Sequence, residues 1–82
     1  MAASKSNIRE WINHGLEAGA THVICVCDTF EWEDFPVYVG KNESVHIKLA
    51  SCQRSSMNTV MEVYNLSMDI EMQLAESRAW HL

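Results

Sequence analysis

Apolar residues recur at helical spacing near the start of the chain, at Ile8, Trp11, Ile12 and Leu16. This spacing predicts a helix over residues 8–18. Asn7 and Glu10 fit a capping box at its start, and Gly19 suits a left-handed cap at its end. Gly15 lies inside the helix, where glycine costs about 1 kcal/mol relative to alanine, so we expect it to allow close packing against a sheet.

Residues 21–27 form a run of β-branched and apolar types that predicts a strand. One face of this strand presents His22, Ile24 and Val26, and the other presents Val23, Cys25 and Cys27. A strand that is apolar on both faces is typically covered on both sides. We expect the helices on one side and a partner subunit on the other.

Residues 28–35 predict a wide loop or an extended hairpin arm, and the single proline, Pro36, precedes a short strand over residues 37–39. Because proline donates no backbone hydrogen bond, that strand should begin at a sheet edge or outside the ladder. Ser44 then fits the cap of a short helix that ends near residue 53.

A longer helix is predicted from Ser55 or Ser56 to about residue 78. It would carry two apolar stripes, whereas a surface helix needs only one. We therefore expect it to pack against its own domain and against another molecule. The first stripe is Met57, Met61, Tyr64, Met68, Met72 and Ala75, and the second is Val63, Leu66, Ile70 and Leu74.

These elements predict an α+β fold: an N-terminal helix, a two-stranded antiparallel β element, a short helix and a long C-terminal helix. Residues 1–82 form one domain, with residues 1–6 as a disordered tail. A hydrophobic content of 48% in 82 residues is high for a body this small. The surplus predicts a homo-oligomer.

Six basic and eleven acidic residues give a net charge of −5. Direct binding of long nucleic acid is not expected, since that function normally needs a basic surface. Three cysteines without framework spacing, no apolar leader and no run long enough for a membrane span predict a cytoplasmic protein. No cofactor is predicted.

Four carboxylates, Asp28, Glu31, Glu33 and Asp34, lie within seven residues. A hard cation favours such oxygen ligands, but the ordered ligand spacing and central glycine of a calcium loop are missing. No nucleophile or oxyanion partner supports acid–base catalysis by these residues. We predict no metal and interpret the segment as a solvated acidic loop that is able to meet a basic protein.

Aromatic residues interleave with these acids, at Phe30, Trp32, Phe35 and Tyr38. Phe30 and Trp32 would share one face of an extended arm, where rings can stack on a base or anchor a protein interface. Arg54, Ser55 and Ser56 would lie at the start of the long helix, a position suited to one phosphate or carboxylate; ordinary helix capping by the serines explains them equally well.

The cysteines and histidines carry weaker signals. Cys25 and Cys27 share a strand face, but His22 lies on the opposite face, and His46 and Cys52 lack the usual paired spacing of a zinc site. Small buried hydrophobic residues are the simpler interpretation of these cysteines. His14, His46 and His81 show no triad pattern, and only an unseen Cys–His geometry would make them catalytic.

Three motifs, CDTF at 27–30, EDFPV at 33–37 and RAWH at 78–81, resemble a family of small uncharacterised proteins encoded by bacteriophages and prophages. The resemblance covers residues 19–82, with a poor match over 39–55 that adds nothing to a role for Arg54. It implies a phage setting, in which small acidic proteins often inhibit host defences by stoichiometric binding. It implies no particular activity.

The leading hypothesis is a non-catalytic anti-defence protein that sequesters a small nucleotide immune signal in a pocket between subunits. Trp32 and Tyr38 would stack the base, while Arg54, Ser55 and Ser56 would hold phosphate. The alternative is direct inhibition of a host defence complex through an acidic protein interface. A small metal-dependent hydrolase built on residues 28–34 ranks third. The predicted protein interface comprises Phe30, Glu31, Trp32, Glu33 and Asp34 together with the stripe Val63, Leu66, Ile70 and Leu74.

Overall fold

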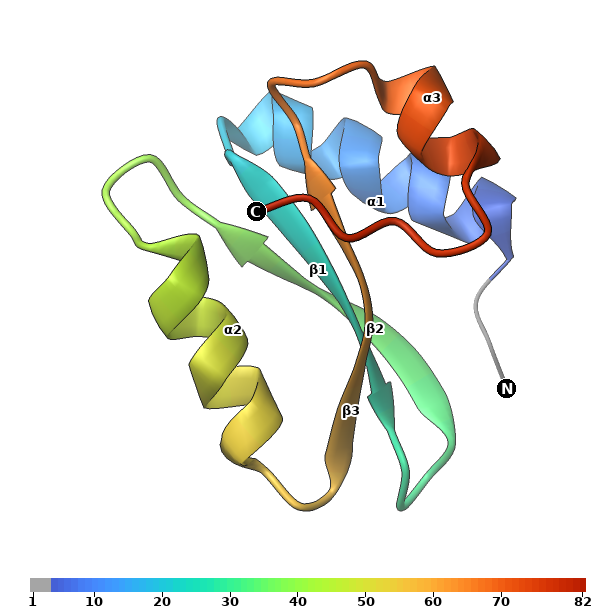
Figure 1. The fold of residues 1–82 in the computed structure, drawn as a ribbon, viewed down its shortest axis with the longest axis vertical. Coiled ribbons are helices and arrows are strands. Elements are labelled where there is room, and N and C mark those ends of the chain that lie inside the picture. The colour runs from blue at the N-terminus through green and yellow to red at the C-terminus, as the bar shows by residue number, and fades with distance from the viewer. Residues whose placement is uncertain (1–3) are drawn as a thin grey trace.

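The segment predicted to be apolar on both faces is the central strand of a three-stranded sheet. In the computed structural model, which describes residues 4–82, β1 (His22–Asp28) pairs antiparallel with β2 (Glu33–Val39) on one side and with β3 (Asn58–Asn65) on the other. The sheet order is β2-β1-β3 (Figure 1). The α+β class is therefore confirmed, with three strands instead of the predicted two.

The first helix, α1 (Lys5–Ala18), begins earlier than predicted because Ser4 caps it. The Ser4 side chain accepts a hydrogen bond from the Asn7 backbone N–H, so the predicted capping box on Asn7 is wrong. Residues 4–6 belong to the cap and the helix and not to a tail, and residues 1–3 lie outside the described part of the chain. Gly19 ends the helix in the left-handed conformation, φ 77°, as predicted.

Helix α1 packs tightly on the sheet at Gly15. A Cβ atom placed there would lie 3.1 Å from Leu66 Cδ1, 3.2 Å from Val23 Cγ2 and 3.3 Å from Tyr38 Cδ1. These distances leave no room for a methyl group unless a neighbour shifts. The glycine inside the helix therefore allows the close approach that the sequence predicted.

Both faces of β1 are covered by helices of the same chain. Helix α1 and the short α3 (Ile70–Ala75) cover one face, and α2 (Val45–Arg54) covers the other (Figure 1). The first core contains Ile8, Ile12, Val23, Cys25, Tyr64, Leu74 and Ala79. The second contains Ile24, Val26, Val39, Val45, Leu49, Val60 and Val63.

This arrangement removes one argument for an oligomer. The prediction that a partner subunit covers the second face of the central strand is wrong, because α2, which Ser44 caps as predicted, covers that face. Any self-association must therefore use surface that remains exposed on the folded chain.

The predicted long C-terminal helix is wrong. Residues 58–65 form β3, a turn follows, and α3 spans only Ile70–Ala75. Thr59, Val60, Val63 and Tyr64 are β-branched or aromatic, and such residues favour a strand that packs on both faces. The Asn65 side chain accepts a hydrogen bond from the Ser67 N–H, and Asp69 caps α3, so two local polar signals divide the segment.

The strand β2 begins at Glu33, four residues before the predicted start, and contains Pro36. It is an edge strand, and proline is tolerated there because its missing N–H does not interrupt the hydrogen bonds of a central strand. Phe35 is partly buried and packs against the core formed with α2.

A buried polar network ties the end of the chain to the start. The Glu62 carboxylate accepts hydrogen bonds from the Tyr64 hydroxyl (3.0 Å), from Lys5 Nζ (3.3 Å) and from the Ala79 N–H (2.8 Å). Val63 then exchanges backbone bonds with Ala79 and His81. Residues 79–81, which follow α3, thereby pair with the outer edge of β3 at Val63.

Candidate functional site

The turn between β1 and β2 forms the lower end of the molecule in Figure 1. Its backbone is held by Asp28, whose Oδ1 accepts hydrogen bonds from the Phe30 N–H (2.9 Å) and the Glu31 N–H (3.4 Å). An aspartate that bonds to backbone two and three residues ahead is a local turn former. Asp28 is therefore a structural residue of the turn.

Trp32 closes this turn in the left-handed region, at φ 57°. It is the single non-glycine residue with positive φ in the described chain. A bulky residue in this region is uncommon, since Gly, Asn and Asp adopt it at lower cost. The tryptophan therefore occupies a position for which turn formation alone would favour another residue.

The side chains of the turn point away from both cores. Phe30 is 71% exposed and Trp32 is 64% exposed, and Glu31 and Glu33 beside them are also exposed. Two large aromatic rings with this exposure, set among carboxylates, are typical of an interaction surface and not of a core.

A second segment joins the turn to form one surface. The Thr29 N–H and Thr29 Oγ1 both donate to the Met57 carbonyl, at 2.7 and 2.8 Å, and Met57 is 45% exposed. Met57 lies in the turn between α2 and β3, far from Thr29 in the sequence. We define the hairpin end as Phe30, Glu31, Trp32, Glu33 and Met57.

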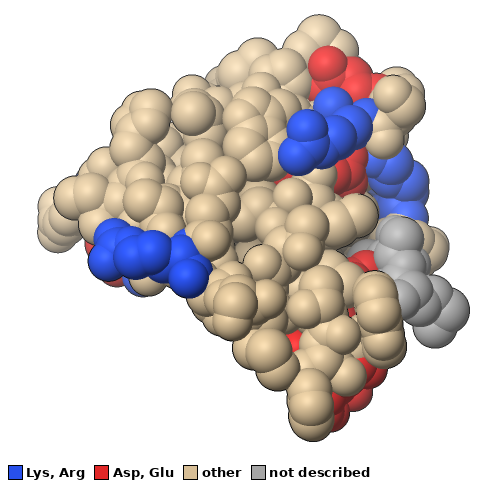
Figure 2. Space-filling model, turned by 60° about the horizontal axis from the view of Figure 1, so that its bottom comes forward, with Lys and Arg blue, Asp and Glu red and all other residues tan. Residues whose placement is uncertain are grey.

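Figure 2 brings this end of the molecule forward. One group of Asp and Glu atoms lies at the lower right and one group of Lys and Arg atoms lies at the left, with uncharged residues between these two groups; further charged residues of both signs lie at the upper right. Four of the five residues of the hairpin end were predictable from the sequence, whereas Met57 was predicted to lie on a helix. The Thr29–Met57 contact has no signal in the sequence, because it depends on the pairing of β3 with β1.

Asp34 faces away from the exposed acids. It lies opposite Cys27 in the strand register and is half-buried, with Oδ1 buried and without a hydrogen-bond partner in the described structure. Burial, followed by a hydrogen bond to the Asp34 carboxylate, raises the pKa of the Cys27 thiol. Of the four predicted acids, Glu31 and Glu33 are therefore the ones exposed at the hairpin end.

The predicted phosphate site at Arg54, Ser55 and Ser56 is wrong in its physical basis. Arg54 is the last residue of α2 and Ser55 is its C-terminal cap, while Ser56 lies in the turn before β3. Carbonyl groups end a helix, so this terminus favours cations, and Arg54 complements it. No helix N-terminus is available here to hold an anion.

Tyr38, the other predicted stacking residue, lies apart from Trp32. It pairs with Val23 near the opposite end of the sheet and packs against the core beneath α1. Burial raises the pKa of its hydroxyl. One chain therefore does not bring Trp32 and Tyr38 together around a base.

The predicted interface stripe does not lie on one helix. Val63 and Leu74 are buried in opposite cores, and Leu66 and Ile70 pack against the core beneath α1. These residues stabilise the fold of a single chain. The helical stripe that motivated their assignment to an interface does not exist.

The described residues contain no group of three or more His, Cys, Asp or Glu side chains able to hold a metal ion. Cys25 and Cys27 lie on one sheet face, whereas Cys52 packs on the other. Burial raises the pKa of the Cys25 thiol to about 12. That environment suits a small core residue more than a metal ligand or a nucleophile.

A cavity of about 340 Å³ lies at the opposite end of the sheet, and its wall includes the apolar Leu16, Ala20 and Leu66 and the polar Thr21, Asn65 and Ser67. His22 and Lys41 contribute to its wall. Burial, and then the neighbouring His46, lowers the pKa of His22, which keeps that ring neutral near pH 7. The cavity is thus largely apolar, with one cation at its edge.

No family model, no curated protein and no solved structure matches this chain. The resemblance to small phage-encoded proteins therefore stays a prediction. In the described residues, no helix has the length and apolar character needed to cross a membrane.

Proposed function

We propose that this chain is a non-catalytic protein-binding module whose hairpin end docks on a basic protein surface. The observation that carries the proposal is Trp32, a largely exposed indole in the left-handed region, at the tip of a turn that Asp28 holds in place. Backbone conformations of this kind persist where the surrounding structure fixes them, and they concentrate at ligand-contacting sites.

The chemistry of the hairpin end selects the partner. Glu31 and Glu33 supply negative charge beside the rings of Phe30 and Trp32. A guanidinium or ammonium group gains both from a carboxylate and from the face of an aromatic ring. Met57 adds a flexible apolar contact that adapts to an irregular surface. An arginine- or lysine-rich protein surface satisfies all three groups.

The resemblance to small phage proteins gives this binding its proposed setting, the stoichiometric inhibition of a host defence complex. Sequestration of a nucleotide has less support, because Tyr38 lies apart from Trp32 and Arg54 ends a helix. A metal-dependent hydrolase on residues 28–34 also has less support, since Asp28 caps the turn and Asp34 faces Cys27.

The test is the affinity of the protein for a fluorescein-labelled arginine-rich peptide, followed by anisotropy. Trp32→Ala should weaken binding about 5- to 30-fold, the range expected for an aromatic anchor worth about 1–2 kcal/mol. Glu31→Gln with Glu33→Gln should weaken binding and flatten its dependence on salt.

The matched control is Glu10→Gln with Glu17→Gln, which removes the same charge from exposed positions of α1. It should leave the affinity nearly unchanged. Equal losses in both charge variants would show that net charge alone attracts the peptide, and the proposal would then fail.

A further inference from the structure

The three arginines of the chain differ in how they are partnered. Arg9 Nη2 donates to Glu71 Oε1 at 2.9 Å. The Arg78 guanidinium lies 4.4 Å from the centre of the Trp80 ring and donates from Nε to the Met61 carbonyl. Arg54 is exposed and, among the described residues, makes no hydrogen bond, ion pair or ring contact.

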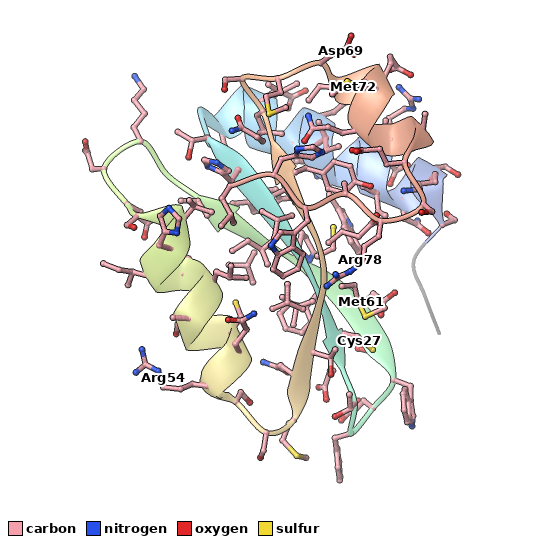
Figure 3. The ribbon with its side chains drawn as sticks, in the orientation of Figure 1. Cys27, Arg54, Met61, Asp69, Met72 and Arg78 are labelled. Atoms are coloured by element: carbon pink, nitrogen blue, oxygen red, sulfur yellow. The ribbon has the colours of Figure 1, made fainter. Side chains whose placement is uncertain are left out.

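Arg54 belongs to the same end of the molecule as the hairpin end. It precedes the turn that carries Met57, and Met57 is bonded to Thr29. Figure 3 shows Arg54 at the lower end of α2, on the opposite margin from the β1–β2 turn. The lower end thus carries a cation on one margin and carboxylates on the other, with the exposed Met57 in the turn between them.

This distribution of charge is complementary to itself. A twofold axis that runs perpendicular to the strands and passes between the two margins brings the hairpin end of one copy against Arg54 of the other. The same contact then forms twice, as in any isologous dimer. Phe30 and Met57 of each copy would meet near the axis and remove apolar surface from water.

We propose that a second copy of this chain occupies the hairpin end, with its Arg54 held by Glu31 or Glu33 and stacked on Trp32. Both halves of this contact have precedents within the chain, since Arg9 pairs with a carboxylate and Arg78 stacks on an indole. A planar guanidinium makes both interactions at once, which an ammonium group does less well.

The contact also regulates the proposed function. Arg54 of the second copy uses the carboxylates and the ring that a basic partner requires, so self-association and partner binding exclude each other. The dimer is then a storage form that releases the hairpin end when a stronger basic partner is present. This competition rests on the proposed function, whereas the dimer itself does not.

The test is sedimentation equilibrium of the purified protein over a wide concentration range at low and high salt. The surface is small, so we expect a weak dimer that dissociates on dilution and with added salt. Arg54→Glu and the pair Glu31→Arg with Glu33→Arg should each give a monomer. Combining all three substitutions should restore dimerisation in part, because the ion pair re-forms with its charges exchanged while the stacking of Arg54 on Trp32 is lost.

Lys41→Glu is the matched control, since it makes the same change of charge as Arg54→Glu at the cavity end of the sheet. It should leave the dimer intact. A wild-type monomer at every concentration, a dimer that survives Arg54→Glu, or a triple variant that stays monomeric would each overturn the proposal.

The outcome is separable from that of the proposed function. Arg54→Glu should leave the affinity for the arginine-rich peptide equal or raise it, because it removes the competitor and adds negative charge. A monomeric protein that binds the peptide through Trp32 would remove only the dimer. A dimer that shows no Trp32-dependent peptide binding would remove only the proposed function.

Discussion

Trp32 is the residue at which folding and binding make different demands. Its φ of 57° suits glycine or asparagine, and its ring is mostly exposed. Replacement of an L-residue in this region by glycine removes a steric cost of about 1–2 kcal/mol, although glycine also loses more chain entropy on folding. The ring is therefore retained at a position where the backbone conformation alone would favour glycine or asparagine.

Trp32→Gly should accordingly leave the free energy of unfolding unchanged or raise it by up to about 1 kcal/mol, while it removes the contribution of the Trp32 ring to peptide binding. Urea unfolding and peptide anisotropy measure the two effects. Asp28→Ala is the contrasting variant, since it removes the cap of the turn and should reduce stability. A strong loss of stability in Trp32→Gly would mean that the ring serves the fold.

At the scale of the elements, the polar network around Glu62 joins β3 to the chain that follows it. Two groups in or near this network, Tyr64 and Cys25, have raised pKa values. Burial, and then the charge of Glu62, raises the pKa of the Tyr64 hydroxyl, and burial raises that of Cys25 to about 12. The folded chain therefore holds these two protons to a higher pH than the unfolded chain does. Their contribution to stability is complete below pH 9 and declines as the pH rises above it.

We therefore expect the free energy of unfolding to fall between pH 9 and pH 11, at about 1.4 kcal/mol per pH unit for each group once its unfolded form has ionised. Urea unfolding across this range measures the slope. Tyr64→Phe and Cys25→Ala should each be less stable at pH 7 and show a shallower decline. Parallel slopes in the wild type and both variants would contradict the assignment.

The helices and strands also show which features of the fold could be predicted from the sequence. The alternation over residues 21–27 predicted a strand covered on both faces, and Gly19 and Ser44 predicted helix ends correctly, because each signal is local. The long helix failed because Met57, Met61, Tyr64 and Met68 fit a period of 3.6 by coincidence. Their strand neighbours Thr59, Val60 and Val63 carried the stronger preference.

The same limit applies to the candidate site. Phe30 and Trp32 were predictable because exposed aromatic residues among acids stand out in the sequence itself. The addition of Met57 required the pairing of β3 with β1, which brings residues 29 and 57 together. The helix N-terminus predicted beside Arg54 was wrong, since Arg54 ends α2 instead of preceding another helix.

At the scale of the whole molecule, the two ends of the sheet differ in the side chains that they expose. The lower end in Figure 1 carries the exposed aromatic and acidic hairpin end, and the upper end carries the apolar cavity beside Lys41. Both sheet faces are buried by the chain's own helices, so the faces offer no large free surface. The surface left for recognition is therefore the two ends, the sheet edges and the outer faces of the helices.

The most direct test is a titration of ¹⁵N-labelled protein with the unlabelled arginine-rich peptide, followed by amide and indole chemical shifts. The account predicts that the changes concentrate on residues 29–33 and 57 and on the Trp32 indole, while amides around Lys41 and the cavity stay unchanged. Changes spread evenly over all acidic surfaces, or centred on the cavity end, would contradict the claim that the hairpin end is the binding site.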